Sequence, residues 1–175
     1  SKYVKSNLKN IFKDVKEKLK NNNYVLFSGT PCQIAGLKSF LGREYDKLYT
    51  IDLICHGVPS QKIFDKYIKF IGKGKKITEF KFRDKEKKDT NIQILSYYRG
   101  NKKIKIRNPQ LDPYYNAFFS KYIFRESCYR CKFANTNRIG DFTLGDFWGV
   151  QNYHKEFKNN RGVSAIILNT KKAKD

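Results

Sequence analysis

The chain has 175 residues, of which 39% are hydrophobic, and a formal net charge of +21 at pH 7. This length fits one folded domain with an ordinary hydrophobic core, and no apolar run approaches the roughly 20 residues that a membrane-spanning helix needs. No basic segment followed by an apolar stretch opens the sequence, so we expect no secretory signal, no membrane span and a cytoplasmic location.

The positive charge comes mainly from lysine, because only eight of the 37 basic residues are arginine. Direct readout of nucleic-acid bases favours arginine, whose planar guanidinium donates two parallel hydrogen bonds. The lysines are also spread along most of the chain. We therefore expect a solvated basic surface and no nucleic-acid partner, with an acidic protein or an anionic substrate as the alternative.

Helices and strands alternate in the first part of the chain. Apolar residues spaced by three and four predict an amphipathic helix over residues 3–20. A tight turn at residues 28–31 separates a short buried strand from the next helix, and Ser60 is a candidate N-cap for a third helix. The predicted strands cover residues 24–27 and 48–54, and the later helices cover residues 32–41 and 60–71.

After Gly74 the apolar positions alternate over shorter runs, which is typical of antiparallel strands. An aromatic-rich helix is expected over residues 109–123. Residues 124–149 hold many Arg, Asn, Gly and Cys residues without a clear period, and we expect a structured site loop there. The predicted strands cover residues 77–83, 91–98, 102–107 and 163–168.

Together these elements predict a mixed α/β (α+β) fold with a central sheet, flanking helices and an irregular cysteine-bearing loop. We expect a single domain over residues 1–175, with a possible α/β half, 1–72, and a mainly antiparallel half, 73–175. The chain begins with Ser1 and contains no methionine, so we expect it to be a fragment of a longer protein.

The four cysteines form the candidate metal site. Cys128 and Cys131 make a C-x-x-C pair, and Cys32 and Cys55 each follow a predicted strand, where α/β sheets place their ligand crevice. Four thiolates fit a 4Fe-4S cluster or a structural zinc ion, and the dispersed spacing favours the cluster. A redox-active dithiol and ordinary buried cysteines are the other interpretations.

Four segments resemble one known family: Phe-Ser-Gly-Thr-Pro-Cys-Gln at 27–33, Asp-Leu-Ile-Cys-His-Gly-Val-Pro-Ser at 52–60, Glu-Ser-Cys-Tyr-Arg-Cys-Lys-Phe at 126–133, and residues 138–149. They resemble, in the same order, the beta-subunit family of coenzyme F420 hydrogenases and dehydrogenases. The resemblance implies an oxidoreductase in which FAD exchanges a hydride with a deazaflavin-like or unknown substrate, while a 4Fe-4S cluster relays single electrons. A non-catalytic zinc-binding or protein-interaction module is the alternative.

The resemblance also bears on partners. Many members of that family carry an N-terminal ferredoxin-like segment with its own cysteine motif, and residues 1–175 contain none. We therefore expect either that missing segment or an acidic electron-transfer protein to exchange electrons with the site. The resemblance implies that residues 1–175 are the C-terminal portion of such a protein. Activity is expected of the longer protein and not necessarily of this fragment by itself.

Several other residues are candidate FAD contacts. Ser28, Gly29 and Thr30 form a small turn before a helix, which suits a phosphate of FAD, although a simple helix-start turn fits equally well. Arg138 can neutralise a thiolate cluster or bind a phosphate, with an ordinary surface charge as the alternative. Asp141 and Asp146 suit acid–base work or cation binding, and they suit turns and caps equally.

No residue is firmly assigned to catalysis. His56 follows Cys55 directly, so it is a candidate for donating a hydrogen bond or moving a proton, with a structural loop histidine as the alternative. Phe147 and Trp148 can stack on a flavin ring, but aromatic residues are more often core, and we expect core positions for both.

Overall fold

The computed structural model describes residues 3–4, 6–84, 94–157, 159 and 162–175. The chain forms two compact units. Unit 1 consists of Ser1–Ser6 and Gly57–Arg130, and unit 2 consists of Asn7–His56 and Cys131–Asp175. Each unit therefore combines two stretches that are distant in the sequence, and the grouping does not follow the halves 1–72 and 73–175. The number of independently folding domains stays a prediction.

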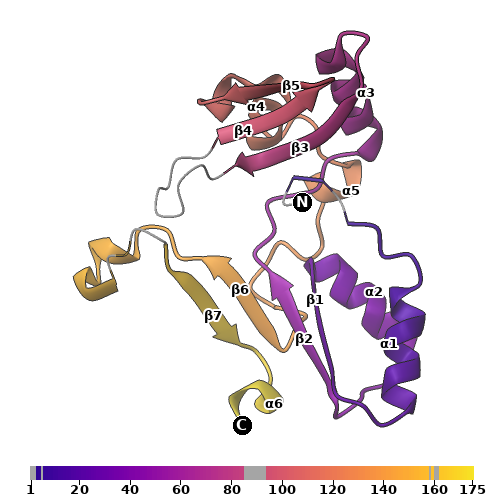
Figure 1. The fold of residues 1–175 in the computed structure, drawn as a ribbon. Helices are drawn as coiled ribbons and strands as arrows, with labels where there is room; N and C mark the ends of the chain where they lie inside the picture. The colour runs from indigo at the N-terminus through magenta and orange to yellow at the C-terminus, as the bar shows by residue number, and fades with distance from the viewer. Residues whose placement is uncertain (1–2, 5, 85–93, 158, 160–161) are drawn as a thin grey trace. The chain divides into compact units, whose positions relative to one another are not determined.

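Unit 2 is built on a four-stranded sheet with the order β1-β2-β6-β7 (Figure 1). Strands β1, β2 and β6 are parallel, and β7 pairs with β6 in the antiparallel direction. The sheet consists of β1 (Val25–Gly29), β2 (Leu48–Leu53), β6 (Phe142–Asp146) and β7 (Ser164–Leu168).

Helices α1 (Ile11–Lys20) and α2 (Pro31–Leu41) lie beside β1 and β2 in Figure 1 and bury the aliphatic core of unit 2. Ile34 and Leu37 of α2 are fully buried. Each such side chain contributes about 1.5–3 kcal/mol by leaving water. The buried core residues are Val15, Leu19, Val25, Phe27, Ile34, Leu37, Leu41 and Leu48.

Unit 1 contains the antiparallel sheet β3-β4-β5 and an aromatic core. Its strands are β3 (Ile77–Asp84), β4 (Ile94–Arg99) and β5 (Lys102–Ile106), and its helices are α3 (Gln61–Gly72), the 3-10 turn η1 (Pro109–Leu111), α4 (Pro113–Phe119) and α5 (Glu126–Tyr129). The rings of Tyr3 and Phe82 lie 4.8 Å apart, and those of Phe80 and Phe82 4.7 Å apart. Such tilted contacts are the arrangement that aromatic side chains prefer.

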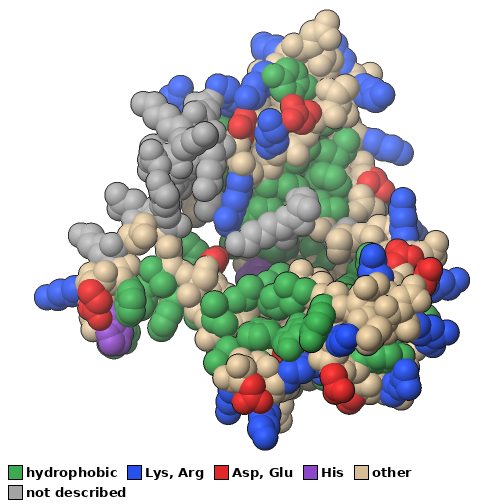
Figure 2. All heavy atoms as spheres, turned by 60° about the horizontal axis from the view of Figure 1, so that its bottom comes forward, with side chains coloured by type: hydrophobic (Ala, Val, Ile, Leu, Met, Phe, Trp, Pro, Cys, Tyr) green, Lys and Arg blue, Asp and Glu red, His purple; other side chains and the backbone are tan. Residues whose placement is uncertain are grey.

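The remaining short elements are η2 (Val150–Asn152), η3 (Lys155–Phe157) and α6 (Lys171–Lys174), all in unit 2. No helix in the described part of the chain has the length and apolar character needed to cross a membrane. On the face that Figure 2 shows, Lys and Arg side chains are scattered among acidic, hydrophobic and other side chains.

The mixed α/β prediction is confirmed, but three local predictions are corrected. The first helix begins at Ile11 and not at residue 3, because Tyr3 is buried in unit 1, where its carbonyl accepts a hydrogen bond from the Tyr114 hydroxyl at 2.9 Å. The helix expected at 109–123 is divided at Asp112, whose carboxylate accepts the Tyr115 N–H and caps α4.

The third correction concerns the loop expected at 124–149, because its last part forms the interior strand β6. This strand buries the polar Thr143 and includes a glycine, so it lacks the apolar alternation by which a strand is recognised. The strand expected at 91–98 is β4, and its first three predicted residues lie outside the described residues.

Candidate functional site

Cys32 and Cys55 lie at the same edge of the sheet in unit 2. Strands β1 and β2 are parallel, and Gly29 pairs with Asp52 at their ends. Cys32 follows Gly29 by three residues, and Cys55 follows Asp52 by three residues. Because parallel strands end at one edge, the structure confirms the placement that the sequence predicted for these two cysteines.

The turn before α2 is organised around Cys32 and Gln33. The Thr30 hydroxyl lies 3.2 Å from the Cys32 sulfur, and the Thr30 N–H donates to the Gln33 side chain at 2.9 Å. A Cβ atom on Gly29 would lie 3.0 Å from the same Gln33 oxygen, so the small residue makes room for this capping contact. Pro31 has no N–H, so the turn offers a phosphate fewer donors than a glycine-rich phosphate loop does.

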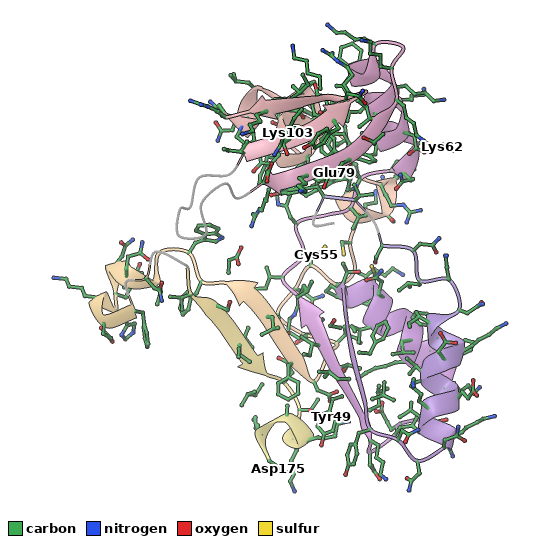
Figure 3. All side chains as sticks on the ribbon, viewed as in Figure 1. Tyr49, Cys55, Lys62, Glu79, Lys103 and Asp175 are labelled. Atoms are coloured by element: carbon green, nitrogen blue, oxygen red, sulfur yellow. The ribbon has the colours of Figure 1, made fainter. Side chains whose placement is uncertain are left out.

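The loop that carries Cys55 follows β2 and begins beside β6. The Ile54 N–H donates to the Leu144 carbonyl at 2.9 Å, which extends the pairing of the two strands by one residue. A Cβ atom on Gly145 would lie 2.5 Å from the Ile54 side chain, so Gly145 allows Ile54 to pack directly over β6. Cys55 and His56 then follow as exposed residues, and Figure 3 labels Cys55 in this loop.

Cys128 belongs to unit 1 and lies in the short helix α5. Its half-buried thiol donates to the Val58 carbonyl at 3.9 Å, and the Arg125 N–H donates to the same carbonyl at 2.9 Å. Gly57 has a φ of 133°, and a Cβ atom there would overlap the Phe124 ring. Glycine is therefore required where this segment approaches Phe124 so closely.

Cys131 is exposed and begins the second stretch of unit 2. All four cysteines are present as thiols. Among the residues that the structure describes, no three His, Cys, Asp or Glu side chains form a group close enough to hold a single metal ion. The assignment of the four cysteines as metal ligands stays a prediction.

A group of polar residues that we call the buried polar cluster lies next to these loops in unit 2. Its centre is the ion pair between Arg138 and Asp52, with 2.5 Å between Nη2 and Oδ1 and side chains that are 12% and 0% exposed. Every buried side-chain N and O atom in the described part of the chain has a hydrogen-bond partner. The cluster consists of Thr50, Asp52, Arg138, Asp141, Thr143, Asn169 and Thr170.

The carboxylate of Asp52 is fully satisfied by protein groups. Its Oδ1 accepts from Arg138 and from the Thr143 hydroxyl at 2.8 Å, and its Oδ2 accepts the N–H groups of Ile139 at 3.2 Å and Gly140 at 2.9 Å. Burial alone raises the pKa of Asp52, but the hydrogen bonds from Arg138, Gly140 and Thr143 outweigh it and hold this pKa below its usual range. Asp52 is therefore an ionised structural acceptor at neutral pH.

Asp141, a predicted FAD contact, is also part of this cluster. Its Oδ2 accepts the N–H and hydroxyl of Thr50 at 2.8 and 2.7 Å, and its Oδ1 accepts the Thr170 hydroxyl at 2.9 Å. Burial acts to raise the pKa of Asp141, and the bonds from Thr50 and Thr170 more than offset it. The described contacts thus show Asp141 bridging β2 and the start of α6.

Of the other predicted site residues, Ser28, His56 and Asp146 are exposed, and Gly29 and Thr30 are half-buried. Asp146 ends β6 at the same sheet edge as the ends of β1 and β2, and Ser28 is exposed near the end of β1. The core positions expected for Phe147 and Trp148 are wrong, because their side chains are 49% and 80% exposed. Both residues follow β6 directly, so the turn after that strand carries them away from the core.

A protein-family model that describes the C-terminal part of the beta subunit in coenzyme F420 hydrogenase/dehydrogenase matches residues 22–175. The chain belongs to this family. The match confirms the resemblance predicted from the four sequence segments and relates the chain to oxidoreductases. No curated protein matches the chain.

All four cysteines and the whole buried polar cluster lie within the part of the chain that matches the beta-subunit family. Arg138 and Asp141 were predicted as site residues from the sequence, whereas Asp52, Thr143 and Asn169 were not. A signal for Asp52 was present, since a carboxylate inside an otherwise apolar strand needs a buried partner. Its partner was not recognisable, because Arg138 is 86 residues away in the sequence.

Proposed function

We propose that this chain is part of a flavin- and iron-sulfur-dependent oxidoreductase in which Cys32, Cys55, Cys128 and Cys131 bind a 4Fe-4S cluster. The observation that carries the proposal is the register of β1 and β2, which directs two of the cysteines to one sheet edge. Membership in a hydrogenase and dehydrogenase beta-subunit family supports the redox chemistry.

The donor set fits such a cluster. Iron–sulfur clusters are held by cysteine thiolates, and the chain offers four thiols, three exposed and one half-buried. A single tetrahedral zinc ion requires sulfurs about 3.8 Å apart, given its Zn–S bonds of about 2.3 Å. A cubane binds each cysteine through a different iron and spaces its ligands more widely. The two centres thus differ in the sulfur separations and in the iron and sulfide contents that they require.

FAD and a deazaflavin-like or unknown redox substrate remain part of the proposal through the family. When bound, the flavin would supply hydride exchange and the cluster single-electron transfer. Arg138 and Asp141 are engaged inside the buried polar cluster, and the Thr30 N–H is bound by Gln33, so these groups do not fit direct contacts with FAD. We keep Ser28 and Asp146, which lie outside that cluster, as the candidates for FAD contacts, and His56 as the candidate for holding or moving a proton.

Partners follow from the family and from the charge. The family is named for a beta subunit, so we propose that the chain works with other subunits. A net charge of +21 favours an acidic surface on the partner that exchanges electrons with it. The proposal includes no nucleic acid.

The test is metal analysis of the full-length protein that contains this chain, prepared without oxygen. We expect about four irons per chain that depend on these four cysteines, in addition to any held by a ferredoxin-like segment, with matching acid-labile sulfide and a flavin absorbance band. Replacing Cys32 or Cys131 by serine lowers the iron content, whereas the matched control Ser127→Ala, which changes an exposed neighbour of Cys128, does not. Stoichiometric zinc without sulfide would show a structural metal domain instead.

A further inference from the structure

The strongest observation beyond the cysteines themselves is that one arginine joins two of the segments that carry them. The Arg138 Nη2 donates to the Leu53 carbonyl at 3.1 Å, and its Nη1 donates to the carbonyls of Phe133 at 3.4 Å and Asn135 at 3.3 Å. Leu53 ends β2 just before Cys55, and Phe133 follows Cys131 by two residues. The guanidinium therefore links the backbone on the two sides at once.

The position of Arg138 is fixed by Asp52. Its Nη2 and Nε donate to Asp52 Oδ1 at 2.5 and 3.2 Å, and its Nε also contacts the Thr143 hydroxyl at 3.2 Å. Both Asp52 oxygens accept further bonds from Thr143, Ile139 and Gly140. The planar guanidinium has five N–H donors, and these contacts hold it in one orientation. Because both Asp52 oxygens are occupied by protein donors, Asp52 stays bound to Arg138.

The link limits where the two cysteines can go. Two residues of extended chain span at most about 7 Å, so the Cα atoms of Cys55 and Cys131 lie within that reach of Leu53 and Phe133. Because both of these carbonyls bind one guanidinium, the two cysteines start from anchors that are fixed relative to each other. A metal centre bound by them gains from ligands that are already in place.

We propose that Arg138, held by Asp52, is a positioning residue that sets the separation of Cys55 and Cys131 for the cluster. The inference rests on the proposed function, because it assigns Arg138 a role toward those ligands. Lysine keeps the charge but is a single point donor, and it cannot bind the Asp52 carboxylate and three carbonyls together.

The alternative is that Arg138 only stabilises unit 2. The test compares Arg138→Lys with Thr170→Ala, which removes a hydroxyl from the same buried polar cluster at Asp141, in the turn between β7 and α6. Both variants are made in the full-length protein, and urea unfolding measures their stability. Iron release to a chelator and the electron paramagnetic resonance spectrum of the reduced protein report on the cluster.

We expect Arg138→Lys to release iron roughly tenfold faster and to change the resonance spectrum, a size typical of groups that orient metal ligands. Thr170→Ala should leave both readouts at the wild-type values. In cluster-free protein, amide hydrogen exchange should rise in Arg138→Lys around residues 54–56 and 132–135 and stay unchanged there in Thr170→Ala.

The outcomes separate the two claims. Wild-type protein that binds iron, together with equal iron release in Arg138→Lys and Thr170→Ala, would overturn the positioning role alone. Wild-type protein prepared without oxygen that holds no iron would overturn the proposed function and the positioning role with it. Unchanged hydrogen exchange in cluster-free Arg138→Lys would show that the link does not order these segments, whatever the cluster does.

Discussion

Unit 1 and unit 2 fill their interiors with different chemistry. Unit 1 buries aromatic rings in contact with one another, whereas unit 2 buries aliphatic side chains beneath α1 and α2 and, on the same strands, ionised and hydroxyl side chains. An aromatic core depends on volume and ring contact, and a polar interior depends on every donor finding its acceptor. The polar interior of unit 2 contacts the segments that lead to Cys55 and Cys131, through the bonds of Arg138 to the Leu53 and Phe133 carbonyls.

The substitution expected to destabilise unit 1 most is one that removes a buried aromatic ring from its core. Phe82 is 7% exposed and its ring contacts those of Tyr3, Phe64, Phe80 and Tyr114. We expect Phe82→Ala to lower the free energy of unfolding of unit 1 by roughly 3–5 kcal/mol through lost contacts and the cavity left behind. Urea unfolding followed by segment-resolved hydrogen exchange measures the loss.

The control for this change is Phe119→Ala, because Phe119 belongs to the same aromatic group but is 47% exposed. We expect it to cost roughly 1 kcal/mol or less. Equal losses for the two variants would contradict the view that buried ring volume stabilises unit 1.

In unit 2 the corresponding test is Thr143→Val, which removes one hydroxyl oxygen and keeps the side-chain volume almost unchanged. Thr143 donates to Asp52 at 2.8 Å and accepts from Asn169 at 2.9 Å. Thr143→Val keeps the side-chain shape but leaves these buried partners short of a bond, so we expect a cost of roughly 1–3 kcal/mol in urea unfolding. The control is Thr78→Val, because Thr78 is exposed in β3. We expect this change to alter the free energy of unfolding by about 0.5 kcal/mol or less. A similar cost for both variants would refute the stabilising role of the buried polar cluster.

Two glycines next to the cluster sharpen the comparison further. A Cβ atom on Gly140 would lie 2.8 Å from the Asp52 backbone N and 2.9 Å from the Phe142 carbonyl oxygen, whereas the three atoms nearest to one on Gly145 all belong to the Ile54 side chain. Backbone cannot move aside as a side chain can. We expect Gly140→Ala to cost roughly 1–3 kcal/mol and Gly145→Ala less, measured by thermal and urea unfolding. The reverse order would show that the two strands are less closely packed than these distances indicate.

Acid should weaken unit 2 through its carboxylates. The pKa values of Asp52 and Asp141 are lowered in the folded state, so their stabilisation is present above the unfolded value of 3.8 and is lost as the pH falls through the folded pKa values. In unit 1, hydrogen bonds from Lys103 and Ser96 lower the pKa of Asp84, so acid also removes stabilisation there. Urea midpoints at pH 7 and pH 3 test this, and Asp141→Asn should lose less between the two pH values than wild type does.

Alkali should weaken unit 1 through its tyrosines, and this is the smallest effect. Burial, with a hydrogen bond to Tyr3, raises the pKa of Tyr115 to about 12, and burial raises the pKa values of Tyr67 and Tyr114 as well. This stabilisation is present below about pH 10, the unfolded value for tyrosine, and is lost as the pH rises through the folded pKa. Tyr115→Phe should therefore lose less stability than wild type between pH 7 and pH 11, and an equal loss would refute the assignment.

The positions of Cys32 and Cys55 could be predicted because they depend on local signals. An apolar strand, a turn with glycine and proline and an amphipathic helix are each encoded within about ten residues. The parallel pairing of β1 and β2 then brings both cysteines to one sheet edge. The helix expected at 3–20 shows the limit of the same reasoning. The apolar spacing of that predicted helix begins with Val4. In the structure, however, the Tyr3 side chain is buried among the aromatic rings of unit 1, and a helix there would leave it without these contacts.

The sequence by itself determined most of the element types, the family and the four candidate ligands, because propensity, periodicity and motif spacing act over short separations along the chain. Only the tertiary structure decided that β6 is an interior strand, that residues 1–6 pack with unit 1, and that Arg138 and Asp141 serve a buried polar cluster. The hydrogen bonds behind those outcomes join residues that lie 86 to 111 positions apart in the sequence. A polar side chain does not encode which distant group will satisfy it, and that choice is made when the strands pair.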